Sequence, residues 1–570
     1  MKANESNFGF MQNEELIIIP FFQRAYVWKE EQWEQFFDDL LESFKRQKEH
    51  FLGSIILKQL TTNAGEGSKR SLIDGQQRLT SFSILVKALY DKLDDGDKAD
   101  YANYLYRRPT KDKNAKIEHS KIDKISFDRI LKATNFNSIE KNEKSRLHAC
   151  YQYFTIRVEG LEESRKFLDY ILNSQLWVVI NLEKDEDEQQ IFDSINSTGV
   201  KLTASDIIKN ALFDKAIALE TNYEELYKEY WEDIFEVENT IDFWQEELST
   251  GRVKRTRSEI FLHAFAVIEG FFDADSSLEY LSNLYKEQIK NFNKDSLKKF
   301  LQKLKEYALI YQDFPKIDKN MTLNFKNPEL KLFHILKITE TNTIAPLLLK
   351  LKAILKDKEN LHLCFKLLEC FILYRWLCAS TTKGYNKIFA KLAQIINKNN
   401  AYDSILNNLK DEIPKQDKVK ESLISKDFNI KNGKATLVLF WIELYRRFKN
   451  KNKQDIIELC YEYTLEHLMP QKWQNNWENI GQNEEYARSL IYQIGNMTLL
   501  TRSLNSTIKN SSWKIKLNGN GKEDKYIKSC ADLLITKELL DIEQWNEEEI
   551  SKRTERLIKE FFEIWNIENY

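Results

Sequence analysis

The sequence predicts a predominantly helical α+β protein that is built from several domains. Its 570 residues are enough for about three or four domains of typical size. Glycine (16) and proline (7) together make up about 4% of the chain, against roughly 12% in an average soluble protein. So few turn-forming residues disfavour a large all-β protein and favour long helices. Short runs rich in β-branched residues occur only in the first part of the chain and near its C-terminus.

The first 215 residues are expected to form an α/β domain, because short β-rich runs alternate there with helical patterns. A charged stretch, residues 104–146, interrupts this alternation, and we expect it to be a solvated helical insertion. The predicted strands are residues 15–20, 52–60, 71–74 and 176–182.

Residues 216–430 are expected to form a helical middle domain, because apolar residues recur there at spacings of three and four. No β-rich run of useful length is found in this part of the sequence. The polar stretch 426–434 then precedes a predicted helix, residues 435–448. We therefore place a third domain at residues 431–570.

Composition excludes several classes of protein. Lys and Arg (85) nearly balance Asp and Glu (88), so any site for a polyanion must be local. The six cysteines form no C-x-x-C pair and the seven histidines no H-x-x-x-H pair, which disfavours a zinc site and indicates reduced cysteines. No signal-like segment or long apolar run occurs, so we expect a cytoplasmic protein without membrane contact.

The first candidate site lies where a predicted strand ends in Asp74-Gly75 and a helix begins at once. A glycine turn before a helix N-terminus directs free backbone N–H groups toward a bound anion. Arg78 can clamp a phosphate there, and Gln76 and Gln77 can add neutral donors. The alternative is an ordinary turn in which Asp74 and Arg78 form an internal ion pair.

Two further clusters could complete that site. Gln23 and Arg24 follow a predicted strand among aromatic residues, which indicates a nucleotide or base pocket or, alternatively, a packed aromatic helix start. Asn196 lies in an Asn/Ser/Gly turn that either only reverses the chain or also contacts a ligand. Thr203 and Asp206, just after this turn, have the spacing of a helix capping box.

The second candidate site lies near the C-terminus. A short predicted strand, residues 463–465, leads into Glu466-His467, and a second, residues 494–500, contains Asn496. Helical residues that include Asn505 follow. This order is typical of a ββα-metal nuclease site, in which an imidazole activates water and oxygen ligands hold one divalent ion.

The chemistry of each side chain suggests its role in this second site. His467 is the candidate general base, because an imidazole titrates near neutral pH. Glu466 and Asn505 offer oxygen ligands for Mg²⁺ or Mn²⁺, and Asn496 can hold the hairpin or orient the histidine. Lys516 can steady the scissile phosphate.

A local excess of positive charge accompanies these residues. The stretch from Thr501 to Cys530 contains seven Lys or Arg residues and only two acidic residues. Such an excess of positive charge favours binding of a nucleic-acid phosphate backbone. The alternative for His467 is a structural role at the end of a strand, beside Pro470.

Taken together, these motifs resemble the GmrSD family of type IV, modification-dependent restriction enzymes, in the form that carries both halves in one chain. The resemblance spans residues 19–213 and about 436–565. It rests on the blocks IPFFQRAYVW, LGSIIL, LIDGQQRLT, FDSINSTGVKLTASDIIKN, YTLEHLMPQKW, IGNMTLL, NSTIKNSSWKIK and EQWNEEEISKRTERLIKEFFEIW.

The resemblance implies a fold for each half. The N-terminal domain would have a ParB/sulfiredoxin-like fold in which the block Asp74 to Arg78 binds a nucleoside triphosphate and can hydrolyse it. The C-terminal domain would be an HNH nuclease embedded in helices, with His467 as its catalytic histidine. Many HNH sites have Asp before this histidine, whereas this chain has Glu466.

The resemblance also implies a function and partners. Relatives restrict phage DNA with modified bases such as glucosylated hydroxymethylcytosine, and the similar SspE proteins sense phosphorothioate DNA. We therefore expect an antiphage DNA endonuclease or nickase that is regulated by a nucleoside triphosphate (GTP, ATP, UTP or CTP), and it could form a homo-oligomer. The alternatives are a nucleotide-binding DNA sensor or scaffold without cleavage activity, and an RNA nuclease.

Overall fold

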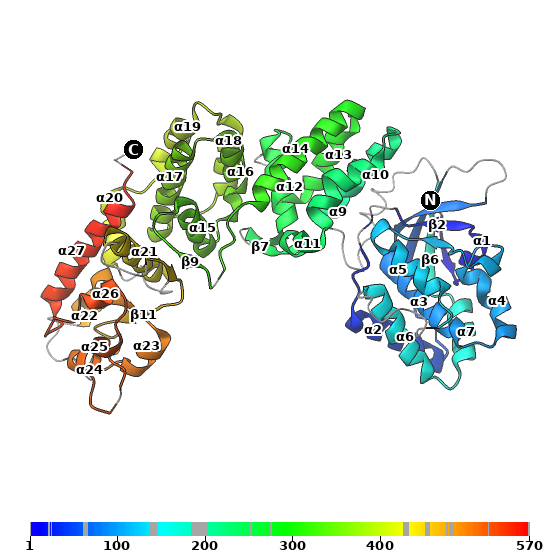
Figure 1. Ribbon diagram of the computed structural model, residues 1–570, viewed down its shortest axis with the longest axis horizontal. Helices are drawn as coiled ribbons and strands as arrows, with labels where there is room; N and C mark the ends of the chain where they lie inside the picture. The colour runs from blue at the N-terminus through cyan, green and yellow to red at the C-terminus, as the bar shows by residue number, and fades with distance from the viewer. Residues whose placement is uncertain are drawn as a thin grey trace. The chain divides into compact units, whose positions relative to one another are not determined.

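The computed structural model divides the chain into two compact units, residues 1–220 and 221–570 (Figure 1). Both units are rich in helices, and the first contains a mixed sheet, so the predicted helical α+β class is confirmed. The structure describes residues 2–20, 23, 25–48, 50–60, 67–135, 145–183, 203–250, 253–273, 276–318, 320–425, 433–450, 457–474, 477, 484–522 and 524–567.

The first unit is built on a six-stranded sheet of order β1-β6-β3-β4-β2-β5. Strands β4, β2 and β5 run parallel to one another, whereas β3 is antiparallel to β4. The carboxyl ends of these three strands therefore lie at one edge of the sheet, together with the start of β3. The strands are β1 (Lys2–Ser6), β2 (Leu16–Ile18), β3 (Gly53–Gln59), β4 (Lys69–Asp74), β5 (Ile117–Glu118) and β6 (Trp177–Leu182).

The helices of this unit have sequences that favour their ends. In α2, acidic residues occupy the first turn and basic residues the last, which complements the helix dipole. Helix α3 follows β4 and is buried along most of its length, where Phe82 packs edge-on against Trp177 of β6. The longer helices are α2 (Glu30–Arg46), α3 (Gln76–Asp91), α4 (Asp95–Leu105), α5 (Lys121–Lys132), α6 (Arg146–Glu159), α7 (Ser164–Asn173) and α9 (Ala204–Ala218).

The capping box that the sequence predicts at Thr203 and Asp206 is confirmed. The Thr203 hydroxyl accepts from the Asp206 N–H at 3.2 Å, and the Asp206 carboxylate accepts from the Thr203 N–H at 3.1 Å. These two bonds begin α9, because they satisfy N–H groups that the helix itself leaves free.

The expectation of a solvated insertion at residues 104–146 is wrong for the residues described there. Strand β5 joins the central sheet, and Phe127 and Ile130 of α5 are fully buried in the core of the unit. The charge count failed because it averaged over both faces of α5, one of which buries Phe127, Ile130 and Leu131 while the charged residues lie mainly on the other.

The second unit begins with a succession of helices, as the sequence predicts for this region. The structure adds a hairpin that the sequence did not predict, β7 (Glu247–Thr250) paired with β8 (Val253–Thr256). Its strands have four residues each and no alternation of apolar residues, so no pattern marked them. The helices of eight residues or more are α11 (Glu238–Gln245), α12 (Arg257–Ile268), α13 (Leu281–Lys290), α14 (Lys294–Gln312), α15 (Pro328–Thr339), α16 (Ala345–Ile354), α17 (Lys358–Leu377), α18 (Tyr385–Ile395), α19 (Ala401–Leu409) and α20 (Gln416–Ile424), with a π-helical segment η3 (Lys228–Glu236).

The C-terminal part of the second unit surrounds a two-stranded antiparallel sheet. Both predicted strands are confirmed, although Ile494–Asn496 forms a 3₁₀ turn before the second strand begins. A separate pair of short strands, β9 (Thr322–Leu323) and β10 (Leu459–Cys460), ties this part to the preceding helices. The main elements are α21 (Gly433–Lys449), β11 (Thr464–His467), α22 (Glu484–Ile491), β12 (Met497–Leu500), α23 (Arg502–Ile508), α24 (Trp513–Asn518), α26 (Leu534–Lys537) and α27 (Glu547–Ile564).

All six cysteines carry free thiols. Among the helices of the described residues, none is long and apolar enough to cross a membrane.

Candidate functional sites

The predicted strand, glycine turn and helix are present at the N-terminal site. Gly75 lies between β4 and α3 with φ = 97°, a left-handed conformation that favours glycine. A Cβ atom at this position would lie 3.2 Å from the carbonyl oxygen of Ser54, so the turn also packs closely on β3. Gly75 thus brings the first turn of α3 directly against the start of β3.

Arg78 lies in that first turn and contacts the sheet edge. Its Nη2 donates to the Ser54 carbonyl at 2.9 Å and to Asp74 Oδ2 at 3.2 Å. The guanidinium lies so close to Gly53 that a Cβ there would overlap it. The internal Asp74–Arg78 pair, one of the two predicted alternatives, is therefore formed, and the phosphate role of Arg78 stays a prediction.

Gln77 fastens the neighbouring segment to α3. Its Oε1 accepts from the N–H of Val27 at 2.8 Å, and the side chain is buried. Its Nε2, the group that was predicted to donate to a ligand, lies 3.5 Å from the Ala25 carbonyl, whereas Gln76 is half-buried at the start of α3. Gln23 is buried after β2, and its N–H donates to Pro20. Arg24 and Asn196 lie outside the described residues.

Sequence reasoning missed a buried polar cluster beside this site. Asp123 Oδ2 accepts from the N–H of Tyr26 at 2.6 Å and lies 3.8 Å from Nδ1 of His119. His119 Nε2 is 3.0 Å from the Thr80 hydroxyl, and Nδ1 accepts from the Ser120 N–H. A polar residue directly after a short strand, as His119 is after β5, was the signal that could have revealed it.

Burial controls the charge of this cluster. It lowers the pKa of His119 to about 3, helped by the charge of Lys124, so the imidazole is neutral. It raises the pKa of Asp123 to about 6, although the hydrogen bond from Tyr26 opposes the shift. Because His119 is neutral, it forms no ion pair with Asp123. The segment after β2 is held instead by the hydrogen bond from the Tyr26 N–H to Asp123.

The N-terminal candidates meet at one edge of the sheet. Asp74 ends β4, Gln23 and His119 follow β2 and β5, and these strands are mutually parallel. In α/β sheets, ligands bind outside the carboxyl ends of such strands. Gln23 and Asp74, which the sequence proposed for nucleotide binding, therefore belong to segments at the same edge of the sheet.

The C-terminal site is centred on His467 at the end of β11, where it pairs with Met497 of β12. His467 is 8% exposed, and its ring lies edge-on to Tyr492. Burial, and then the charge of Lys516, lowers the pKa of His467 to about 4, so the imidazole is neutral at pH 7. Its Nε2 is buried and has no hydrogen-bond partner among the described residues.

Asn496 holds the chain that follows His467. Its Oδ1 accepts from the Met469 N–H at 2.8 Å and from Trp545 Nε1 at 2.9 Å, and its Nδ2 donates to the carbonyls of Met469 and Ile491. Its own carbonyl accepts from the N–H of Leu468. Asn496 is fully buried, so this geometry gives it the hairpin-holding role.

Lys516 and Glu466 form a buried ion pair. Lys516 is completely buried, and its Nζ donates to the Glu466 carboxylate and, at 2.8 Å, to the His467 carbonyl. Burial acts to raise the pKa of Glu466 and to lower the pKa of Lys516, while their mutual attraction opposes both shifts. The ammonium predicted to steady a phosphate thus contacts the two residues at the end of β11.

Asn505 lies on α23, beside the same strand. Its Nδ2 donates to the Thr464 hydroxyl and to the Leu465 carbonyl, both at 3.0 Å. With Glu466 it offers one amide oxygen and one carboxylate, a donor set that fits a hard cation such as Mg²⁺ that keeps several waters. In the described part of the chain, no group of three or more His, Cys, Asp or Glu residues is gathered for a metal.

The comparisons with known proteins cover both candidate sites. The N-terminal domain of the GmrSD restriction endonucleases matches residues 8–213, and their C-terminal domain matches residues 413–560. No curated protein matches the sequence. The chain therefore belongs to the GmrSD family of type IV restriction endonucleases.

Proposed function

We propose that the chain cuts DNA at an HNH centre formed by β11, β12 and α23, with His467 as general base. The observation that carries this proposal is the neutral His467 imidazole, whose buried Nε2 has no hydrogen-bond partner in the described part of the chain. An imidazole that is already neutral at pH 7 can accept a proton, and an unpaired nitrogen is able to do so.

In the proposed reaction, His467 Nε2 takes a proton from a water molecule while the water oxygen attacks the phosphorus. The phosphorus–oxygen bond to one sugar breaks, and solvent protonates the departing oxygen. Asn496 keeps the backbone after His467 fixed during this step, because both its side chain and its carbonyl hold residues 468–469. Lys516 fixes the His467 carbonyl from the other side.

Glu466 and Asn505 would hold Mg²⁺ or Mn²⁺ in this centre. When bound, the ion would supply positive charge against the negative charge that develops on the phosphate. Glu466 is the one carboxylate of this donor set, and Lys516 keeps it in place through their ion pair.

The surface around α23 and α24 supports a DNA substrate. Lys509, Lys514 and Lys528 are exposed there, within the stretch where basic residues outnumber acidic ones by seven to two. Exposed lysines gathered in this way contact phosphates independently of base sequence.

We further propose that a nucleoside triphosphate bound at the N-terminal sheet edge regulates cutting, and that modified phage DNA is the substrate in antiphage defence. The support is the first turn of α3, where Arg78 already grips an anionic group, Asp74. A phosphate would compete with this carboxylate for the guanidinium.

Cleavage assays on matched substrates test this function. Modified phage DNA, its unmodified counterpart and a structured RNA are incubated with the full chain, with and without Mg²⁺ or Mn²⁺ and each of the four nucleoside triphosphates. We expect metal-dependent cutting of modified DNA that a nucleotide changes. Binding of DNA without any cutting would contradict the nuclease and favour the sensor, and preferential cutting of RNA would contradict the DNA substrate.

A further inference from the structure

A buried arginine on the C-terminal helix α27 contacts the turn between α22 and β12. Arg553 is 1% exposed, although it carries a full positive charge. Its Nη1 donates to the carbonyls of Gly495 and Met497 at 2.6 and 2.5 Å, and its Nη2 donates to the Ile535 carbonyl at 3.0 Å. Arg553 is thus the point at which α27 joins the turn that precedes β12.

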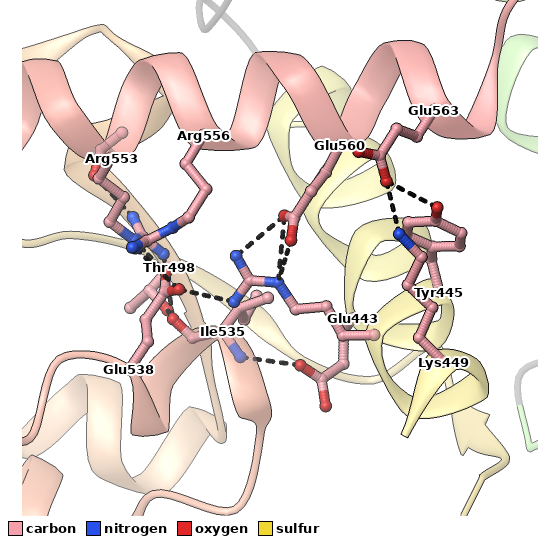
Figure 2. A network of polar contacts seen from close by, with 12 residues as sticks. Glu443, Tyr445, Lys449, Thr498, Ile535, Glu538, Arg553, Arg556, Glu560 and Glu563 are labelled. Carbon is pink, nitrogen blue, oxygen red and sulfur yellow. Dashed lines mark hydrogen bonds and ion pairs between the residues drawn. The ribbon is translucent and has the colours of Figure 1, made fainter. Parts of the chain in front are cut away.

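Glu538 balances the charge of this arginine. Its Oε1 accepts from Arg553 Nε at 2.5 Å, and Arg446 of α21 and the half-exposed Arg556 of α27 also contact it, as Figure 2 shows for Arg553 and Arg556. Burial acts to raise the pKa of Glu538, but Arg553 and Arg446 outweigh it, and the pKa lies below its usual value. The carboxylate therefore stays ionised and keeps Arg553 in place.

The turn that Arg553 holds is closed from the other side by the backbone of the same helix. A Cβ atom on Gly495 would lie only 2.6 Å from the Thr554 N–H nitrogen and would overlap the Ile550 carbonyl. Gly495 therefore lets α27 approach the turn directly. The backbone on both sides of Asn496 is thus fixed by α27, through packing and through the two bonds from Arg553.

These contacts lead step by step to the general base. Arg553 fixes the carbonyls on either side of Asn496, and Asn496 accepts hydrogen bonds from the N–H groups of Leu468 and Met469. Those two residues directly follow His467. We propose that Arg553 is a positioning residue of the nuclease centre, which sets the place of His467 through Asn496; this inference rests on the proposed function of His467.

An arginine is needed for this role because its donors lie in one plane and point in several directions. The guanidinium makes three bonds to backbone carbonyls while its Nε meets Glu538. A lysine would keep the positive charge beside Glu538, but its single ammonium cannot span the same set of acceptors.

The test compares Arg553→Lys with Arg556→Lys in the full chain. Arg556 is a matched control, because it lies on the same helix and contacts the same Glu538 but is half exposed, and in the described part of the chain it makes no bond to the turn. We expect Arg553→Lys to lower the kcat of DNA cleavage about 10- to 100-fold at unchanged DNA affinity, because a displaced base misses its reactive geometry. Arg556→Lys should change neither quantity.

A second measurement needs no cleavage and so separates this inference from the proposed function. Amide hydrogen exchange at Leu468 and Met469 should become faster in Arg553→Lys than in the wild type, and remain unchanged in Arg556→Lys. Unchanged exchange, or a wild-type kcat in the folded Arg553→Lys variant, would overturn the inference. A variant that does not fold would also overturn it, because Arg553 would then support the domain as a whole. If the wild type cuts no nucleic acid but the exchange changes as expected, the proposed function fails and the positioning contact stands.

Discussion

Two buried histidines show how the two candidate sites differ. His119 in the first unit and His467 in the second both follow or end a short strand, and burial keeps both imidazoles neutral. The Nε2 of His119 is bonded to Thr80, whereas the Nε2 of His467 has no partner among the residues that the structure describes. The bonded imidazole of His119 therefore braces the fold, whereas under the proposed function the unbonded Nε2 of His467 is the atom that would accept a proton.

The same contrast holds for the cations. Arg78 contacts Asp74 at the edge of the N-terminal sheet, where both side chains are partly exposed and a ligand can compete. Lys516 is completely buried on Glu466 and also bonds the His467 carbonyl. We therefore expect a bound phosphate to displace Asp74 from Arg78. The Lys516–Glu466 ion pair should instead stay formed and support the fold.

Replacing Lys516 is expected to have the largest effect on stability. Lys516→Met leaves Glu466 buried without its counter-charge, and breaking a buried pair in this way costs about 3–5 kcal/mol. Urea unfolding of the full chain, followed through the transition of the second unit, measures this loss of stability. Lys514→Met, an exposed lysine on the same short helix, is the control, and an equal effect of both variants would contradict the buried pair.

Replacing Asp123 is expected to have a smaller effect, which depends on pH. The pKa of Asp123 is about 6 in the folded protein, above its usual value of 3.8, so the folded state binds the proton more tightly. Wild-type stability therefore falls as pH rises from about 4 to about 6. Asp123→Asn does not titrate and can still accept the bond from Tyr26, so it should gain about 3 kcal/mol over the wild type at pH 7.5.

Unfolding of Asp123→Asn and the wild type at pH 4.5 and pH 7.5 measures this gain. The difference between the two proteins should be small at the lower pH and large at the higher one. A difference that is the same at both pH values would show that the carboxyl does not titrate in this range.

The smallest expected effect concerns the exchangeable pair. Arg78→Ala should weaken binding of a nucleoside triphosphate about 10-fold, because a single charge-assisted contact to phosphate is lost. Isothermal titration with each of the four nucleotides measures this change. Arg165→Ala, which removes an exposed arginine paired with Asp97, is the control. Equal affinity of the wild type and Arg78→Ala would exclude the phosphate clamp.

Local patterns in the sequence predicted the two strands of the proposed C-terminal site, and the structure confirms both. His467, Asn496 and Asn505 were selected because each lies at a fixed offset from a short strand or helix, and their roles stay predictions. Glu466 and Lys516 were also found, but not their ion pair. A sequence pattern gives the type of each residue and its place on an element, whereas the pairing of residues 50 positions apart depends on tertiary packing.

The elements that the sequence missed depend on distant partners. Strand β1 (Lys2–Ser6) is polar and forms only because it pairs with β6, and β5 has two residues. Arg553 did leave a signal, since it lies on the buried face of α27 with Ile550 and Leu557. A charged residue on an apolar stripe indicates a buried acceptor, but it does not say which carbonyls accept.

Variants of the two histidines give the most direct test of His467 as the general base. His467→Ala and His119→Gln are assayed in the full chain for cleavage of modified DNA and for thermal unfolding, under the best conditions for the wild type. We expect His467→Ala to bind DNA and stay folded but to lose about 10²- to 10⁴-fold in cleavage rate. His119→Gln should lower the unfolding temperature and leave the cleavage rate of the folded protein unchanged. Cutting by His467→Ala at the wild-type rate would contradict the role of His467 as the general base.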